Sequence, residues 1–153
     1  YDLNKWLNKN RKKYINIPNL WTGIEISCLL KNCLVHAIGL GFNLYHKSLL
    51  PYTTGEAPKG EYLNASLVVS SLHQAGGIVI LAHPARYRLP YTELIYEAAR
   101  LGFDGGEAWY DYEYKSPWKP TELICNSIDK LLKSLHLIST CGTDTHGLDI
   151  STR

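Results

Sequence analysis

The chain contains 153 residues, of which 45% are hydrophobic and 20% charged, with a formal net charge of +2. This length suits one domain with a buried core, and the composition is that of a globular protein. No apolar run approaches the roughly 20 residues of a membrane span, so we expect no membrane insertion. The small net charge does not demand a polyanionic partner, and no stable protein partner can be inferred.

The amino-terminal third predicts one helix and two strands. Residues 1–14 show a helical pattern, with basic side chains within 5–13 opposite an apolar face. We expect this helix to cover the domain; contact with a nucleic acid or an anionic surface is the alternative. Residues 24–27 and 34–40 predict strands, and the Pro- and Gly-rich stretch 43–61 predicts an excursion loop. The apolar helix face comprises Leu3, Trp6, Leu7 and Tyr14.

From residue 63 onward, helical and strand patterns alternate with short connections. The continuous apolar run at 78–82 is typical of a strand covered on both faces. The alternation predicts βαβ units and a parallel sheet of about five strands. Because a closed eightfold barrel takes about 250 residues, we expect an incomplete barrel or a small open sheet. The predicted elements are helices at 63–75, 94–101 and 123–135 and strands at 78–82, 103–109 and 137–140.

The four cysteines form neither a CxxC pair nor a dense disulfide pattern. We therefore expect reduced thiols and a cytoplasmic protein. Cys28 and Cys141 fall at predicted strand ends, where a free buried thiol is common. The other two are Cys33 and Cys125.

Possible metal ligands follow two of the predicted strands. His83 directly precedes Pro84, which should hold its backbone extended and direct the imidazole toward the loop side. Asp144 and His146 are one residue apart after the last strand, so their side chains can face the same way and share a metal. Each has an ordinary alternative: a histidine bonded to a nearby carbonyl, or a turn, where Asp and His are common.

Two further titratable residues interrupt apolar strands. An unpaired carboxylate at Glu25 would be costly, so this residue should be paired, protonated or metal-bound. His36 interrupts the run 34–40, and core packing with one hydrogen bond is its alternative. Together with the ligands above, these side chains offer nitrogen and oxygen donors without thiolate, which suits Zn, Mn or Fe. Such ions lower the pKa of bound water and stabilise charge on a phosphoryl oxygen.

Three other groups of residues are weaker candidates. Arg86 and Arg88 follow His83 and could bind a substrate phosphate, with solvated loop arginines as the alternative. Glu107 could be a further acid or could pair with a nearby base. Aromatic residues beyond position 108 could stack against a nucleobase, although packing explains most such clusters. They are Trp109, Tyr110, Tyr112, Tyr114 and Trp118.

Four ordered motifs resemble those of the PHP (polymerase and histidinol phosphatase) domain family. They are Gly23-Ile24-Glu25-Ile26-Ser27, Val35-His36-Ala37-Ile38-Gly39-Leu40, Ala82-His83-Pro84 and Gly142-Thr143-Asp144-Thr145-His146-Gly147. Each motif is short, but their order and spacing together are specific, and the similarity runs from about Trp21 to Gly147. The stretch from His73 to Arg88 looks like the stand-alone PHP phosphoesterases of bacteria.

The resemblance implies an α/β fold, a distorted (β/α)7 TIM-like barrel with two or three divalent metal ions at the carboxyl ends of its strands. It also implies hydrolysis of phosphate esters, such as small nucleotides or short oligonucleotides, by metal-activated water. Glu25 resembles the carboxylate that bridges metals in the family. By position, the residues that match family metal ligands are Glu25, His36, His83, Asp144 and His146.

The chain departs from the family pattern at its amino end. The family opens with a His-x-His strand, an Asp and a Thr-Asp-His strand, and none of these occurs before Glu25. The chain also begins at Tyr1 and contains no Met. We therefore expect residues 1–153 to be the carboxyl-terminal portion of a single PHP domain that lacks the first one or two β/α units. The alternatives are a catalytically incomplete remnant that binds a metal or a partner without turnover, and a polymerase-associated proofreading module.

Overall fold

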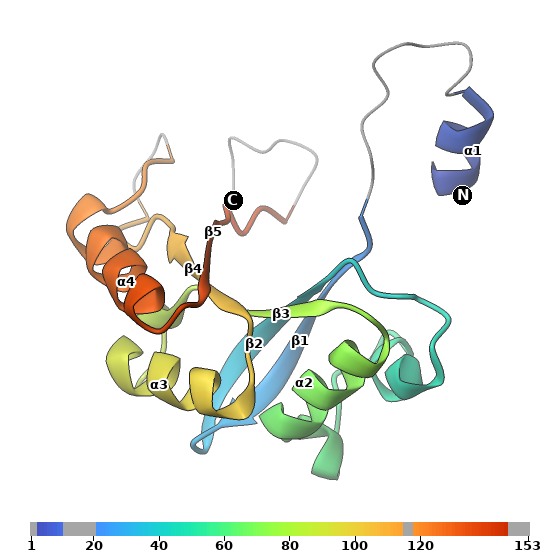
Figure 1. Ribbon diagram of the computed structural model, residues 1–153, viewed down its shortest axis with the longest axis horizontal. Coiled ribbons are helices and arrows are strands. Elements are labelled where there is room, and N and C mark those ends of the chain that lie inside the picture. Colours follow the sequence, from blue (N-terminus) through green and yellow to red (C-terminus); the bar gives the residue numbers. More distant parts are fainter. Residues whose placement is uncertain (1–2, 11–20, 115–117, 147–153) are drawn as a thin grey trace.

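The computed structural model describes residues 3–10, 21–114 and 118–146 and shows a mixed α/β protein built on one five-stranded sheet (Figure 1). The strands β1 (Gly23–Leu30), β2 (Cys33–Leu40), β3 (Ile78–Leu81), β4 (Gly105–Trp109) and β5 (Ile138–Cys141) lie side by side in chain order. The α-helices are α1 (Leu3–Asn10), α2 (Ala65–Gln74), α3 (Tyr91–Leu101) and α4 (Glu122–Ser134). The 3-10 helices are η1 (Lys47–Tyr52), η2 (Gly60–Leu63) and η3 (Pro84–Arg86). The mixed α/β class is confirmed, and the sheet formed by the described residues is open.

The sheet is not parallel throughout, so this part of the prediction is wrong. β1 and β2 form an antiparallel hairpin, and β2 is also antiparallel to β3. The hairpin turn consists of Lys31 and Asn32 at φ values of 50° and 56°. Two successive positive φ values match the right-handed twist of a two-residue hairpin. The parallel arrangement holds for β3, β4 and β5.

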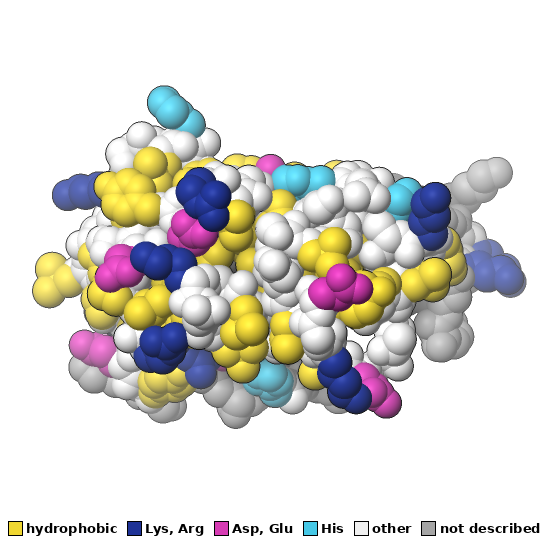
Figure 2. Space-filling model, turned by 90° about the horizontal axis from the view of Figure 1, so that it is seen from below, with side chains coloured by type: hydrophobic (Ala, Val, Ile, Leu, Met, Phe, Trp, Pro, Cys, Tyr) yellow, Lys and Arg dark blue, Asp and Glu magenta, His cyan; other side chains and the backbone are white. Residues whose placement is uncertain are grey.

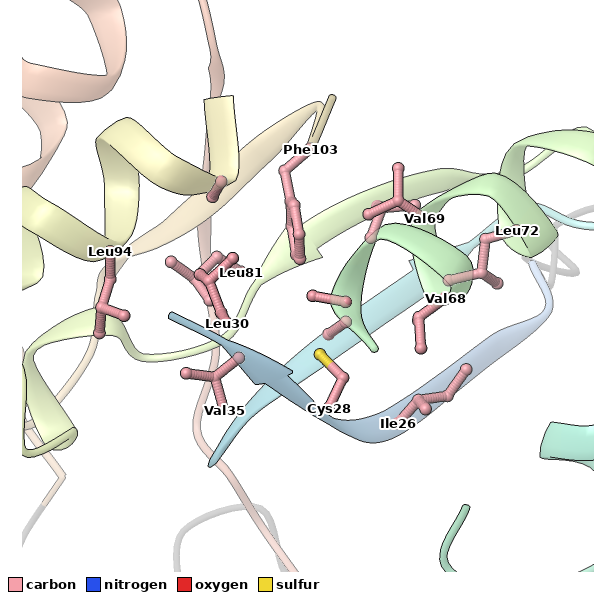
Figure 3. Packing of buried hydrophobic residues seen from close by; sticks show 14 of the residues in the cluster. Ile26, Cys28, Leu30, Val35, Val68, Val69, Leu72, Leu81, Leu94 and Phe103 are labelled. Atoms are coloured by element: carbon pink, nitrogen blue, oxygen red, sulfur yellow. The ribbon is translucent and has the colours of Figure 1, made fainter. Parts of the chain in front are cut away.

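One face of the sheet packs against helices and forms the hydrophobic core (Figure 3). Side chains alternate between the two faces of a strand, and the burial of β1 and β2 follows this alternation over much of their length. The buried side chains of the hairpin meet those of α2 and α3, while α4 packs on β4 and β5. The opposite face of the hairpin is therefore available for polar groups. Core residues include Ile26, Cys28, Leu30, Val35, Val68, Leu72, Leu81, Leu94 and Phe103.

The loops and thiols mostly follow the sequence pattern. The excursion expected at 43–61 lies between β2 and α2, and it contains the helix η1 and the start of η2. All four cysteines are free, as predicted, but Cys141 is exposed rather than buried. Cys141 ends β5, but Cys28 lies inside β1, because that strand continues to Leu30.

The surface on the helical side carries charges of both signs. Figure 2 shows basic and acidic side chains interspersed with apolar ones on this face, without a large patch of either sign. In α1, Leu7 is buried, which agrees with its predicted apolar face, whereas Tyr14 lies outside the described residues. No helix in the described part of the chain combines the length and apolar character needed to cross a bilayer.

Candidate metal centre

The open face of the hairpin carries two of the predicted ligands. In the antiparallel register, Glu25 lies opposite Ile38 and Ser27 lies opposite His36, so Glu25 and His36 are diagonal neighbours on one face. A glutamate side chain is long enough to span this diagonal. Glu25 lies near the start of β1, inside the strand. Antiparallel pairing, rather than a shared strand end, brings these two residues together.

The third predicted ligand, His83, lies just after β3 and has an unusual backbone. Its φ of 25° and ψ of 63° differ from the extended conformation that Pro84 predicts. The His83 amide donates a 2.9 Å hydrogen bond to Oε2 of Glu107, and η3 begins at Pro84. These contacts override the preference of a residue before proline. Such backbone strain costs roughly 1–3 kcal/mol and concentrates at functional sites.

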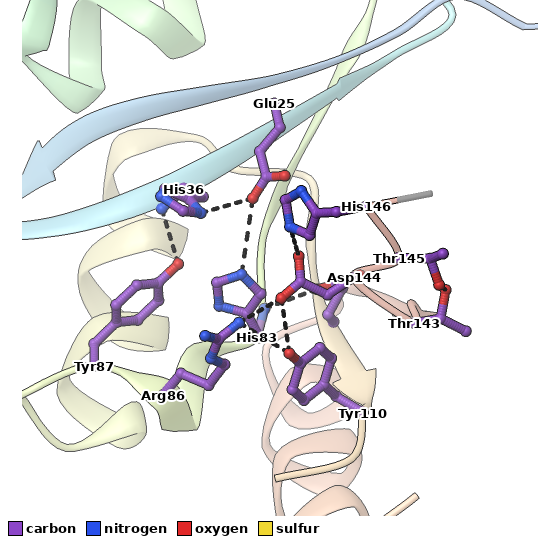
Figure 4. Close-up of polar contacts among 11 residues, drawn as sticks. Glu25, His36, His83, Arg86, Tyr87, Tyr110, Thr143, Asp144, Thr145 and His146 are labelled. Carbon is purple, nitrogen blue, oxygen red and sulfur yellow. Dashed lines mark hydrogen bonds and ion pairs between the residues drawn. The ribbon is translucent and has the colours of Figure 1, made fainter. Parts of the chain in front are cut away.

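Glu25, His36 and His83 converge on one point (Figure 4). Oε1 of Glu25 lies 2.7 Å from Nδ1 of His36 and 3.7 Å from Nε2 of His83. One possible ligand atom from each of the three residues lies within 4.8 Å of the other two. Two imidazoles and one carboxylate are a common ligand set for a divalent metal ion. We call these three residues the triad.

The ring of His36 tests whether a cation suits this point. Its Nδ1 atom is buried and makes no aligned hydrogen bond, even though the Glu25 carboxylate is only 2.7 Å away. The short contact is an ion pair when His36 is protonated. A buried polar atom left without a hydrogen bond costs about 1–3 kcal/mol. A ligated cation would satisfy this nitrogen, so the donor set fits a divalent metal.

Charge in the triad also favours a cation. Contact with His36, and then with His83, lowers the pKa of Glu25 against the opposing effect of burial. The same contact with Glu25 raises the pKa of His36, again against burial. Positive charge is thus stabilised next to an ionised carboxylate. This is the electrostatic property that a metal site requires.

Asp144 approaches this region from the loop after β5, and Arg86 of η3 binds it (Figure 4). Nη1 of Arg86 lies 2.5 Å from Oδ2 of Asp144, and the Tyr110 hydroxyl donates to the same oxygen at 3.0 Å. Burial raises the pKa of Asp144, but Tyr110, His83 and Arg86 outweigh it, and the net shift is downward. Asp144 is therefore a carboxylate at neutral pH.

A cavity of about 290 Å³ lies between Glu25 and His83 of the triad and Asp144. Glu25, His83, Glu107 and Asp144 contribute its polar lining. His146 lies further out: its side chain is 80% exposed, and its Nε2 atom is 3.2 Å from Oδ1 of Asp144. The structure thus brings Glu25, His83 and Asp144 to one cavity and places His146 beside Asp144.

The two candidate phosphate-binding arginines lie in different places. The Arg86 guanidinium is next to Asp144 and lies over the rings of Tyr110 and Tyr114, at 5.6 and 5.2 Å from their centroids. Arg88 donates from Nη2 to the carbonyl of Asn32 at 2.7 Å. Arg88 therefore stabilises the hairpin turn, while Arg86 lies beside the cavity.

Two residues of the site had weak or no signals in the sequence. Glu107 is 6% exposed and accepts the His83 amide instead of pairing with a base. Burial raises the pKa of Glu107 against that hydrogen bond. Tyr87, to which the sequence analysis gave no role, accepts the backbone amide of His36 at 2.8 Å.

Two of the aromatic residues that could stack on a base pack against each other instead. Tyr110 is fully buried and its ring packs against that of Tyr112, with the centroids 5.1 Å apart. Tyr114 is 54% exposed, but the Arg86 guanidinium covers one side of its ring. The packing alternative therefore describes Tyr110 and Tyr112.

Comparison with known proteins identifies the fold. No protein-family model and no curated protein matches the sequence. The structure is similar to that of an amidohydrolase from Chromobacterium violaceum, which was solved with bound sulfate and no metal. The two superpose with a TM-score of 0.72 and 15% sequence identity, and the match covers 98% of this chain and 75% of the amidohydrolase chain. A candidate metal-dependent phosphoesterase from Bifidobacterium adolescentis gives a TM-score of 0.61 at 18% identity, over 92% of this chain and 72% of its own. The chain therefore shares the fold of these two proteins.

Proposed function

We propose that this chain is a metal-dependent phosphoesterase of the PHP type, which hydrolyses phosphate esters such as small nucleotides or short oligonucleotides. The convergence of Glu25, His36 and His83 beside a cavity that Asp144 also lines carries the proposal. Nitrogen and oxygen donors next to a guanidinium suit the hydrolysis of an anionic ester. The fold shared with a candidate metal-dependent phosphoesterase supports the same class of reaction.

The triad would hold the first divalent ion. Such an ion lowers the pKa of a bound water and stabilises charge on a phosphoryl oxygen. The donors suit Zn, Mn or Fe, and no cysteine lines the cavity among the described residues. We assign Asp144 and His146 to a second ion, because their motif resembles the PHP ligand motif and their side chains contact each other.

Arg86 would bind the phosphate of the substrate. Hydrogen bonds to Asp144 and Tyr110 hold its guanidinium in place. A planar guanidinium that is already fixed loses little side-chain entropy when it binds a phosphate. A second cavity of about 460 Å³ runs along β1 and shares Glu25, so it offers room for the rest of the ester.

Metal-stimulated hydrolysis by the 153-residue chain tests this proposal. Metal-free protein is assayed with p-nitrophenyl phosphate, mononucleotides and short oligonucleotides, before and after addition of Zn²⁺, Mn²⁺ or Fe²⁺. We expect metal-dependent turnover that falls roughly 10–100-fold or more in His36→Ala. His46→Ala is the matched control, because His46 caps η1 and does not line the cavity. Turnover that is missing with every metal, or unchanged in His36→Ala, contradicts the proposal.

A metal-binding domain without turnover is the second candidate. Among residues 3–10, 21–114 and 118–146, the triad is the group of ligand residues close enough to share an ion. The PHP resemblance, in contrast, implies two or three ions. Tight metal binding by the wild-type chain, without hydrolysis of any of these esters, would favour this candidate.

A further inference from the structure

Both histidines of the triad have a backbone amide that is bound by a side chain from elsewhere in the chain. The Tyr87 hydroxyl accepts the amide of His36 at 2.8 Å, and Oε2 of Glu107 accepts the amide of His83 at 2.9 Å. The second contact is the more deeply buried, since Glu107 is 6% and His83 4% exposed. Water therefore cannot readily replace Glu107 as the partner of this amide.

The backbone around Glu107 is shaped to allow this contact. The register between β4 and β5 shifts between Glu107 and Trp109, which marks a bulge. Bulges next to active sites re-aim side chains. A Cβ atom at Gly142 would collide with Oε1 of Glu107, so only glycine leaves the space that the carboxyl group occupies. Gly142 is tied to β4 through its amide, which donates to the Trp109 carbonyl at 3.2 Å.

The bound amide belongs to the residue with the strained backbone. His83 has a φ of 25° directly before Pro84, where an extended conformation is preferred. Without the Glu107 hydrogen bond, the peptide would be free to relax toward that conformation. Its imidazole, whose Nε2 now lies 3.7 Å from Glu25, would then leave the triad.

We propose that Glu107 is a positioning residue, which keeps His83 in its metal-binding conformation by accepting its amide, and that Gly142 provides the space for this bond. The proposal rests on the proposed function, because it takes His83 to be a metal ligand. Glu107 acts through His83 and need not touch the ion. The role is independent of protonation, since a carboxyl group keeps an acceptor oxygen in either state.

The affinity of the full chain for Co²⁺ or Mn²⁺ tests this role without an activity assay. Calorimetric titration gives the Kd, and the visible absorption of Co²⁺ reports the ligand geometry. Glu107→Gln keeps an acceptor oxygen and should bind within about threefold of wild type. Glu107→Ala should bind roughly 10–100-fold more weakly, the usual effect of losing a group that orients a ligand. Gly142→Ala should weaken binding similarly by displacing the carboxyl group.

Ile128→Val controls for general loss of stability, because Ile128 is buried in α4 and does not line the cavity. It should bind metal as wild type does. The inference is overturned if Glu107→Ala binds as tightly as wild type, or if Glu107→Gln is as weak as Glu107→Ala. If Glu107→Ala does not fold, Gly142→Ala decides the question in the same way. A wild-type chain that binds no metal would instead overturn the proposed function.

Discussion

Replacing Gly105 by Ala tests how closely β4 packs against β5, with Gly106→Ala in the same strand as the matched control. A Cβ atom at Gly105 would meet the backbone oxygen and Cβ of Ile138 and the side chain of Ile80. The backbone of Ile138 cannot move away without disturbing the register in which it pairs with Gly105. A Cβ atom at Gly106 would make its tightest contacts, at 3.2 and 3.4 Å, with the end of the Leu132 side chain. This side chain is flexible and can shift to make room.

The expected difference follows from these contacts. Both substitutions restrict the unfolded chain, which stabilises the fold by about 0.4–1 kcal/mol. Overpacking at Gly105 costs roughly 1–3 kcal/mol or more, so we expect a net loss of about 1–2 kcal/mol in the free energy of unfolding. Gly106→Ala should stay within about 0.5 kcal/mol of wild type. At about 2–4 °C per kcal/mol for a chain of this size, Gly105→Ala should lower the Tm by about 2–8 °C.

Urea and thermal unfolding, followed by circular dichroism, measure both variants under the same conditions. The comparison needs no knowledge of the function, because both glycines lie in one strand and receive the same added methyl group. Equal stability of the two variants, or a larger loss for Gly106→Ala, would refute the packing of β4 described above.

Three further perturbations address the site and the hairpin. An imidazole must be neutral to bind a metal ion, and Glu25 raises the pKa of His36 above its usual 6.5. The metal affinity, measured by calorimetry, should therefore increase as the pH rises through that raised pKa. Over the same interval the metal-free chain loses the stabilisation that protonated His36 gains from Glu25. A metal affinity that does not change as the pH rises above 6.5 would contradict the expected increase. Arg86→Ala should raise the KM for a phosphate ester about tenfold or more while leaving metal affinity near wild type; an unchanged KM excludes a phosphate-binding role. Asn32→Gly should preserve or raise the Tm, whereas Asn32→Val should lower the free energy of unfolding by about 1–2 kcal/mol, because the φ of 56° disfavours a β-branched residue. Equal Tm values for the two variants would contradict the positive φ of Asn32 in the hairpin turn.

The carboxyl-terminal half of the fold is encoded in local patterns. The helix expected at 94–101 is α3 (Tyr91–Leu101), and Gly102 ends it at a φ of 89°, a conformation that glycine adopts freely. The apolar run at 78–82 contains β3 (Ile78–Leu81). These elements are visible in the sequence because each must present an apolar face or run to the core.

The hairpin is not encoded in the same way. Its turn, Lys31-Asn32, lacks the glycine that usually marks a two-residue connection. The apolar pattern of β1 and β2 fits parallel and antiparallel strands equally well. Strand direction depends on pairing between segments, so the expectation of a wholly parallel sheet failed at β1 and β2.

The sequence revealed residue types at the site but not their geometry. Glu25 and His36 stood out because polar groups inside apolar strands are costly unless they are satisfied. The backbone of His83, however, is set by a hydrogen bond to Glu107, 24 residues away. The partner of the His36 amide is likewise remote in sequence, since Tyr87 is 51 residues away. No local rule predicts either contact.

X-ray absorption spectroscopy of the chain loaded with one equivalent of Zn²⁺ tests most directly whether Glu25, His36 and His83 bind one ion together. We predict nitrogen and oxygen neighbours at about 2.0–2.2 Å from the zinc, with imidazole scattering that decreases in His36→Ala. A sulfur neighbour at about 2.3 Å, or a spectrum that is identical in His36→Ala, would contradict shared binding by the triad.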